Sequence, residues 1–327
     1  MLQKRLFITG GNGFIGSRVV RKLIEQGYSV RCLLRPTSRT DRIDDLAFER
    51  CAGDVRDLSS LRRGLSGCNG LIHLAGLSNW KEIHSPAMRQ IVVTGTQNAL
   101  QAAQSEGGLP VVFVSSLTTI NGASQPCLLN EDSHFSLKDK KAFVYTYAKR
   151  EAELLCQKAA WAGLPVVIVN PAEVYGPDDS GLVTAGNLVD FARSNPVFVS
   201  RGGTSVVHVD DVAAGIIAAF ERGRPGQRYI LGGDNLTVKE LATTTLSLLG
   251  QTKRIIVVPN RVLLGLAWLG RNWHLPLPFN PAVIPYAVRF WFADNSRARR
   301  ELGLNFRSAR ETLEPTLRWL QNQGYIR

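Results

Sequence analysis

Residues 10–16 are Gly10-Gly11-Asn12-Gly13-Phe14-Ile15-Gly16, a Gly-x-x-Gly-x-x-Gly spacing that follows an apolar run and precedes an amphipathic one. Glycine in such a turn lets the backbone approach a pyrophosphate without a Cβ, and the amides and dipole of the following helix face the negative charge. A plain strand-to-helix turn also uses glycine, but the position between strand and helix favours dinucleotide binding. We therefore predict that a dinucleotide is contacted by Gly10, Gly13, Phe14, Ile15 and Gly16.

Short β-branched runs alternate with longer amphipathic segments through the first half of the chain. This alternation is typical of βαβ units and of a parallel sheet buried on both faces. Strands are predicted at Arg5–Thr9, Ser29–Leu34, Phe48–Ala52, Gly70–Leu74, Val111–Ser115 and Val166–Val169. Helices are predicted at Phe14–Gln26, Ser59–Ser66, Ala87–Ser105 and Ala142–Ala162. The pattern predicts an α/β fold with a doubly wound parallel sheet, the NAD(P)-binding Rossmann fold.

The regular alternation ends after Pro171. A strand at Val206–Val209 is expected to lead into a helix, and Tyr229–Gly233 to form another short strand. Capping boxes at Thr237–Glu240 and Ser308–Glu311 begin two helices, so a smaller, mainly helical C-terminal substrate domain is predicted. We expect a dinucleotide-binding domain of residues 1–171, to which 205–233 return, and a substrate-binding domain of 172–204 and 234–327. The polar, turn-rich residues 121–141 are expected to form a loop at the mouth of the site.

Length and composition exclude several classes of protein. The chain has 327 residues, which fits one large domain or two smaller ones that share a cleft. Its 44% hydrophobic and 20% charged residues exclude disordered and fibrous chains. The net charge of +12 favours anionic partners such as phosphorylated cofactors, nucleic acid or acidic lipid. Because the late arginines lie on apparent helix faces without interleaved aromatic residues, we expect no nucleic-acid partner.

The cysteines indicate a reducing compartment. Their odd number, their scatter and the lack of a Cys-x-x-Cys pair fit reduced thiols better than disulfides or a metal site. They are Cys32, Cys51, Cys68, Cys127 and Cys156. Met1–Ile8 lacks a signal-peptide core, and Val262–Leu269 is far shorter than the roughly 18 apolar residues of a membrane span. We expect a cytoplasmic protein with no bound metal and no membrane span.

The end of the second predicted strand bears on the choice of dinucleotide. An NAD site usually places Asp or Glu there to bind the adenosine ribose, whereas this chain has Arg35, followed by Ser38 and Arg39. A guanidinium can hold a 2′-phosphate through paired hydrogen bonds. The alternative is that these arginines are only solvated loop residues. We predict that Arg35 binds the cofactor, with NADP(H) preferred and NAD(H) possible.

A tyrosine and a lysine mark the candidate chemistry. Tyr145 and Lys149 lie four residues apart at the start of a predicted helix, hence on one face. An ammonium beside a phenol would lower the phenol pKa, so that it could exchange a proton with a carbinol or carbonyl oxygen. The alternative is an ordinary surface pair, since Tyr-x-x-x-Lys alone is a weak signal. Together with the glycine turn, the pair predicts that Tyr145 and Lys149 are catalytic and also contact the nicotinamide ribose.

Hydroxyl groups follow the fifth predicted strand, where a parallel sheet delivers its ligands. We predict that Ser116 holds the substrate oxygen against the phenol, and that Thr118 contacts substrate. Ser115 or Thr118 are alternatives for the role of Ser116. The hydroxyls could also merely cap the strand end.

Several motifs together resemble the extended short-chain dehydrogenase/reductases, the NAD-dependent epimerase/dehydratase group. They are the glycine turn, Gly53-Asp54-Val55-Arg56-Asp57, His73-Leu74-Ala75-Gly76, Ser115-Ser116, Tyr145-x-x-x-Lys149, Asn170-Pro171 with Tyr175-Gly176-Pro177, and His208-Val209-Asp210-Asp211-Val212. The resemblance covers nearly the whole chain. It implies that Asp54 and Val55 contact adenine, that Ala75 and Gly76 line the cofactor path, and that Pro171 and Val174 border the nicotinamide.

Within this group the chain resembles the dihydroflavonol reductase-like branch, which includes hopanoid-associated sugar epimerases. Two positions depart from the family pattern. The family's Asn-Val-x-Gly-Thr stretch is Val92-Val93-Thr94-Gly95-Thr96 here, which removes a polar group from the site. Thr204-Ser205 stands where nucleotide-sugar enzymes tend to carry an arginine for the diphosphate.

Two catalytic hypotheses follow. The first is an NADP-dependent oxidoreductase that reduces a ketone or aldehyde, or oxidises a secondary alcohol, of a small molecule; the second is a nucleotide-sugar epimerase or dehydratase with tightly held NAD. The missing ribose carboxylate and the missing diphosphate arginine favour the first. Late aromatic residues would suit an apolar substrate pocket, or plain core: Trp268, Trp273, Phe279, Tyr286, Phe290, Trp291 and Phe292. A non-catalytic binding protein is disfavoured by the intact Ser, Tyr and Lys set. A homodimer is compatible with the sequence, which does not determine the oligomeric state.

Overall fold

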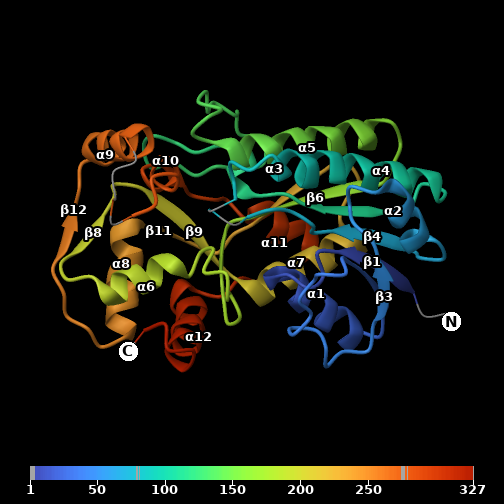
Figure 1. Ribbon diagram of the computed structural model, residues 1–327, viewed down its shortest axis with the longest axis horizontal. Helices are drawn as coiled ribbons and strands as arrows, with labels where there is room; N and C mark the ends of the chain where they lie inside the picture. The colour runs from blue at the N-terminus through green and yellow to red at the C-terminus, as the bar shows by residue number, and fades with distance from the viewer. Residues whose placement is uncertain (1–3, 79, 81, 274–276, 278, 327) are drawn as a thin grey trace.

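A seven-stranded parallel sheet forms the centre of the larger part of the molecule (Figure 1). The computed structural model describes residues 4–78, 80, 82–273, 277 and 279–326, so Met1–Gln3 of the N-terminal segment discussed above lie outside the described residues. In spatial order the strands are β10 (Arg228–Leu231), β6 (Val166–Pro171), β5 (Val111–Val114), β4 (Gly70–His73), β1 (Arg5–Thr9), β2 (Ser29–Leu34) and β3 (Glu49–Ala52). The chain order reverses between β1 and β4, the point at which doubly wound sheets bind ligands. The predicted doubly wound fold is confirmed.

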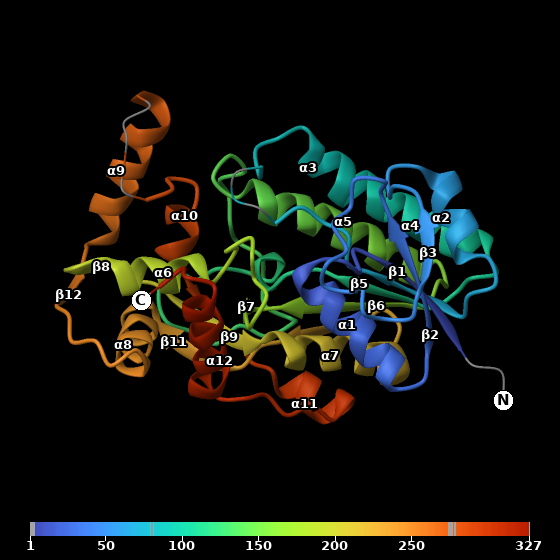
Figure 2. The ribbon, with the colours of Figure 1, turned by 60° about the horizontal axis from the view of Figure 1, so that its bottom comes forward.

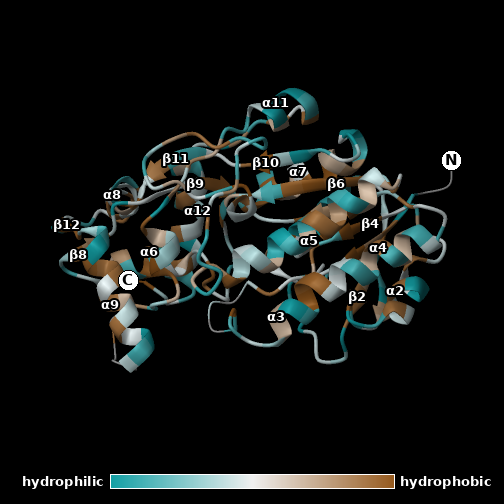
Figure 3. Ribbon diagram, turned by 90° about the horizontal axis from the view of Figure 1, so that it is seen from above, coloured by the Kyte–Doolittle hydropathy of each residue, from teal (hydrophilic) through white to brown (hydrophobic). Residues whose placement is uncertain are grey.

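Helices cover both faces of this sheet (Figures 1 and 2). One face carries α1 (Phe14–Glu25), α7 (Val209–Arg222) and α11 (Ser296–Leu302). The other carries α2 (Leu58–Leu65), α4 (Gly95–Ser105) and α5 (Val144–Trp161). The central strands are buried on both sides, which is why their sequences are continuous apolar runs (Figure 3).

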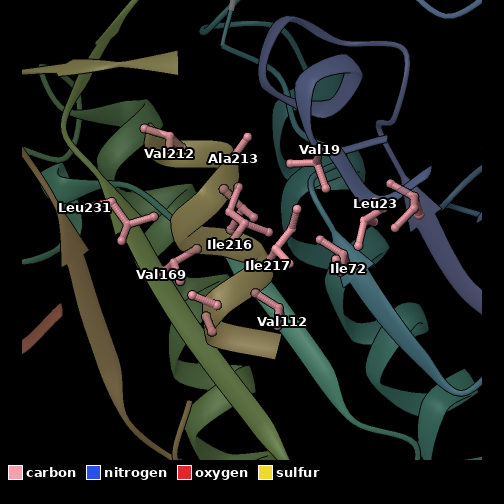
Figure 4. Packing of buried hydrophobic residues seen from close by; sticks show 14 of the residues in the cluster. Val19, Leu23, Ile72, Val112, Val169, Val212, Ala213, Ile216, Ile217 and Leu231 are labelled. Carbon is pink, nitrogen blue, oxygen red and sulfur yellow. The ribbon is translucent and has the colours of Figure 1, made fainter. Parts of the chain in front are cut away.

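The core beneath α1 and α7 shows how these helices are fixed (Figure 4). Val19 and Leu23 of α1 and Ile216 of α7 are fully buried, at the helical spacing that places apolar residues on one face. They pack on strand residues such as Ile72. Since α1 begins at the glycine turn, this packing also fixes the turn at the carboxyl end of β1.

The predicted helix Ala87–Ser105 is interrupted. It consists of α3 (Ala87–Arg89), a π-helical turn at Gln90–Thr94, and α4. Val92, at the position where the family has asparagine, is buried and apolar. The Thr96 hydroxyl, one turn further on, donates to the Val92 carbonyl at 2.6 Å and lies 3.2 Å from His73 Nε2. Beside Val92, the polar contact with His73 is therefore made by the Thr96 hydroxyl.

The smaller part of the molecule is built on a second sheet. Its strands are β11 (Asp234–Thr237), β9 (Gly203–His208) and β13 (Phe290–Trp291), with β7 (Glu173–Tyr175) also paired to β9, and a separate ribbon of β8 (Val197–Val199) and β12 (Ile255–Val257). Its helices are α6 (Gly186–Arg193), α8 (Val238–Leu248), α9 (Asn260–Trp273), α10 (Ile284–Ala287) and α12 (Ala309–Asn322). Both predicted capping boxes are present, at the starts of α8 and α12. The predicted strand after residue 205 is β9; it joins this second sheet, while the next strand, β10, joins the first.

Residues 121–141 follow a 3₁₀ turn at Leu117–Thr119 and form an irregular segment. Within it, isolated bridges join Ala123 to Phe290 and Leu129 to Ala293. The loop itself is confirmed. Its place at the mouth of the site stays a prediction, since the two bridges fix only Ala123 and Leu129. All five cysteines are free thiols.

Candidate active site

A cleft of about 400 Å³ lies at the carboxyl ends of the parallel strands. Of the residues predicted to bind cofactor or substrate, all but Thr118 line it. They are Gly10, Gly13, Phe14, Ile15, Gly16, Arg35, Asp54, Val55, Ala75, Gly76, Ser116, Tyr145, Lys149, Pro171 and Val174. The fold therefore brings the glycine turn and Tyr145, more than a hundred residues apart in the sequence, into the wall of the same cleft.

The glycine turn leaves no room for side chains. Gly10 has a φ of +73°, and a Cβ on Gly16 would lie 2.0 Å from the Gly10 carbonyl oxygen. Gly13 caps the N-terminus of α1 and has no side chain to bond the first-turn amides. These amides and the positive end of the helix dipole are therefore available to an anionic group, as a pyrophosphate requires.

Arg35 is the unpaired cation at the end of β2. Its backbone N–H donates to Ser38 Oγ at 3.0 Å, and no described carboxylate bonds its guanidinium. By contrast, Arg39 is absent from the cleft wall, exposed, and paired with Asp41 at 3.3 Å. Asp54 lies across the same end of the cleft, where bidentate hydrogen bonds from Arg56 lower the pKa of its carboxyl group.

Tyr145 and Lys149 extend from the first turns of α5 beside Ser116, which follows β5. The Lys149 Nζ donates to the Val114 carbonyl at 2.8 Å and lies 5.3 Å from the centre of the Phe113 ring. Burial lowers the pKa of Lys149 to about 8, and the nearby Glu153 carboxylate opposes this shift.

The pKa of Tyr145 shifts in the opposite direction to the one we predicted. Burial raises it above the usual value of 10.0, and a hydrogen bond with Ser116 offsets this only in part. The Lys149 ammonium instead donates a hydrogen bond to the Val114 carbonyl of β5. The phenol is therefore neutral at pH 7 and able to donate its proton.

Glu153 is a buried carboxylate that the sequence did not lead us to predict, and it supports the cleft wall through hydrogen bonds. Glu153 accepts hydrogen bonds from Ser115 Oγ at 2.5 Å, from Thr119 Oγ1 at 2.7 Å and from Asn170 Nδ2 at 2.9 Å, and it is paired with Arg228 at 3.0 Å. Its spacing could have indicated this role, because Glu153 follows Lys149 by four residues and so lies on the same helix face. Because Ser115 is bonded to Glu153, Ser116 is the serine whose hydroxyl is left for the cleft.

The contact of Thr118 with substrate stays a prediction. The 3₁₀ turn at Leu117–Thr119 directs its hydroxyl back to Ser116 Oγ, at 3.1 Å, and it does not line the cleft. Thr118 thus orients Ser116. The sequence reading also missed Val183 and Thr184, which line the cleft because the buried Asp179 carboxylate binds both of their backbone N–H groups.

The late aromatic residues do not line the cleft. Tyr286, Phe290 and Trp291 are buried, so the plain-core alternative holds for these three. Thr204 and Ser205 are likewise buried in β9 and present no cation. Among the described residues, no group of three His, Cys, Asp or Glu side chains is arranged to hold a metal ion.

Fold and cleft together define an oxidoreductase of the extended short-chain dehydrogenase/reductase kind, built to bind a nicotinamide dinucleotide. Residues 6–232 match the family model described as the NAD dependent epimerase/dehydratase family. The chain belongs to this family.

Two curated relatives match nearly the whole chain, and a third matches 72% of it. It is 33% identical over 332 residues to a Synechocystis protein named "Putative dihydroflavonol 4-reductase", with 98% of this chain and 96% of the relative covered. It is 30% identical over 331 residues to sterol demethylase protein B of Methylococcus capsulatus, covering 98% and 99%. Cinnamoyl-CoA reductase 1 of rice is 32% identical over 254 residues, or 72% of each chain.

Solved structures agree in fold. The crystal structure of gox2253 has a TM-score of 0.85 and 28% identity, covering 99% of this chain and all of that one. DesIV, a dTDP-glucose 4,6-dehydratase from Streptomyces venezuelae solved with NAD and TYD bound, has a TM-score of 0.77 and 26% identity over 98% of each chain.

Proposed function

We propose that this protein uses NADP(H) to reduce a ketone or aldehyde of a small molecule, or to oxidise the corresponding alcohol, secondary in the case of a ketone, in reverse. The observation that carries this proposal is the meeting of the Tyr145 phenol, the Ser116 hydroxyl and the Lys149 ammonium in one cleft wall beside the glycine turn. When bound, the nicotinamide would supply or accept the hydride.

Tyr145 would act as the proton donor. Its raised pKa keeps the phenol protonated through the neutral range, so it can give a proton to a carbonyl oxygen as charge develops there. Ser116 would bind the same oxygen and orient it toward the phenol. Lys149 would bind the nicotinamide ribose, and Pro171 and Val174 would border the ring.

Arg35 would bind the 2′-phosphate of NADP(H), with Ser38 beside it in the cleft wall. Asp54 and Val55 would contact the adenine, while Ala75 and Gly76 would line the path between the two ends. Asp41, Asp44 and Asp45 pair with arginines outside this wall, so these three carboxylates do not compete for the ribose position.

We expect Arg35→Ser to weaken NADPH binding about 10- to 100-fold, because charge-assisted hydrogen bonds to the phosphate would be lost. The Kd for NADH should stay unchanged, since NADH has no 2′-phosphate. Fluorescence titration with each cofactor checks this, and Arg39→Ser, a loop arginine paired with Asp41, is the matched control. Equal losses for both cofactors would show that Arg35 does not distinguish them.

Lys149 gives the proposal a pH dependence. The pKa of Lys149 is about 8, so its side chain is charged below that pH and loses its charge as the pH rises through it. Tyr145 keeps its proton to a higher pH, because burial raises its pKa above 10.0. The kcat/KM for NADPH, which reports the free enzyme, should therefore fall above about pH 8 with a slope of one proton. In Lys149→Arg this fall should disappear, because arginine stays charged. An unchanged profile in that variant would assign the fall to another group.

A nucleotide-sugar epimerase or dehydratase with tightly held NAD is the second candidate, supported by the similarity to DesIV. The reductases among the relatives, and Thr204-Ser205 in place of a diphosphate arginine, favour the first. The deciding experiment incubates the protein with a panel of aldehydes and ketones plus NADPH, and with UDP- and GDP-sugars. Stoichiometric NADPH consumption supports the reductase; sugar conversion without net cofactor turnover supports the epimerase or dehydratase.

A further inference from the structure

Residues 241–293 form a segment of unusual charge. They include no aspartate or glutamate but five cations, Lys253, Arg254, Arg261, Arg271 and Arg289. The helix α9 lies in the middle of this segment and extends from the end of the molecule that is remote from the glycine turn (Figure 2). Its charge and surroundings therefore differ from those of the cleft.

One face of α9 is already buried. Ala267 is fully buried, and it packs with Leu263 against Ile284 and Val288. Asn260 fixes the start of the helix, because its side chain accepts from the Arg201 amide and donates to the Val288 carbonyl. The helix thus has the inner contacts that a surface helix needs.

The outer surface of α9 also exposes large apolar side chains, next to the polar Arg261, Arg271 and Asn272. Trp268 and Trp273 are 53% and 68% exposed, and Val262, Leu264 and Leu266 are between 37% and 49% exposed. These five are more than half of the large hydrophobic side chains that are exposed among the described residues. Large apolar side chains gathered on one surface helix in this way are ordinarily covered.

The charges around this surface limit what can cover it. Arg261 and Arg271 lie on α9 itself, and neither forms an ion pair with a described residue. Two copies of α9 packed on each other would bring four arginines together with no carboxylate from the segment to balance them. An anionic lipid surface instead offers hydrocarbon for the tryptophan and leucine side chains and phosphate for the arginines.

We propose that α9 binds the surface of an anionic lipid bilayer, lying in the interface with its tryptophans among the headgroups. It would not cross the bilayer, since no helix in the described part of the chain is long and apolar enough to do so. The proposal is independent of the reaction in the cleft, because no residue of α9 lines it.

The test is sedimentation of the full chain with vesicles of phosphatidylcholine alone and of an equimolar mixture with phosphatidylglycerol. We expect binding to the mixed vesicles, weakened by salt, with a blue shift of tryptophan fluorescence. Trp268→Ser/Trp273→Ser should lower the partition coefficient at least about tenfold. Trp161→Ser is the matched control, because Trp161 is 86% exposed on α5, away from α9. Arg261→Gln/Arg271→Gln should remove the preference for the mixed vesicles.

Cofactor affinity and thermal unfolding of each variant establish that it is folded. The proposal is overturned if the wild-type chain binds neither vesicle, or if the tryptophan double variant, folded, binds as the wild type does. It is also overturned if sedimentation velocity shows a wild-type oligomer that the double variant dissolves while vesicles bind neither protein. In that case α9 would be a contact between copies of the chain.

Discussion

The variant Tyr145→Phe should retain cofactor binding and lose about 10²- to 10⁴-fold in kcat for carbonyl reduction. The substitution removes the hydroxyl that we propose as the proton donor and keeps the ring that packs in the cleft wall. The measurement is steady-state NADPH oxidation with the best substrate of the carbonyl panel, accompanied by the Kd for NADPH.

Tyr147→Phe is the control for this loss. Tyr147 lies on the same helix, but its hydroxyl donates to the Leu137 carbonyl at 2.5 Å and does not line the cleft. Its variant should turn over substrate at close to the wild-type rate. If Tyr145→Phe did the same, the phenol would not be the proton donor and the proposed chemistry would be wrong.

The variant Gly16→Ala should bind NADPH and NADH about 10- to 100-fold more weakly. The added Cβ would lie 2.0 Å from the Gly10 carbonyl oxygen and 2.9 Å from the Gly11 Cα, so the backbone of the turn must move. Both cofactors carry the same pyrophosphate, and the loss should therefore be equal for the two. This equality distinguishes the variant from Arg35→Ser.

Gly265→Ala provides the comparison, because a Cβ there meets no atom within 4 Å. In the middle of a helix, alanine should stabilise slightly and leave both Kd values unchanged. Far-UV circular dichroism would establish that Gly16→Ala is folded. A folded Gly16→Ala with wild-type affinity would show that the turn does not hold the cofactor.

Local patterns predicted much of the fold. The bounds of β1 and β2 agree with the expected strands, because apolar β-branched runs ended by turn residues allow few alternatives. The sheet that a strand joins is a tertiary property, so the pattern could not assign β9 to the second sheet. The π-helical turn inside Ala87–Ser105 was also unpredictable, since it keeps a helical periodicity.

The sequence motifs predicted which residues meet at the site, but not how their side chains are oriented or how their pKa values shift. Gly10 and Tyr145 are far apart in the sequence, yet a parallel sheet must bring them to one edge. The orientation of Thr118 depends on a single 3₁₀ turn, and the pKa of Tyr145 depends on how far the folded chain excludes water. Neither quantity is encoded in residue spacing.

The ion pair between Glu153 and Arg228 bears on how the enzyme matures during synthesis. Arg228 belongs to β10, which is translated well after the serine, tyrosine and lysine of the cleft. Until that edge strand docks, Glu153 lacks its Arg228 partner and keeps only the hydrogen bonds from Ser115, Thr119 and Asn170. A ribosome-bound chain that ends at Pro171 already holds Ser116, Tyr145 and Lys149, but it lacks the strand whose arginine pairs with the carboxylate behind them. We expect the cleft wall to be fully ordered only when β10, the last strand of the seven-stranded sheet in chain order, is added.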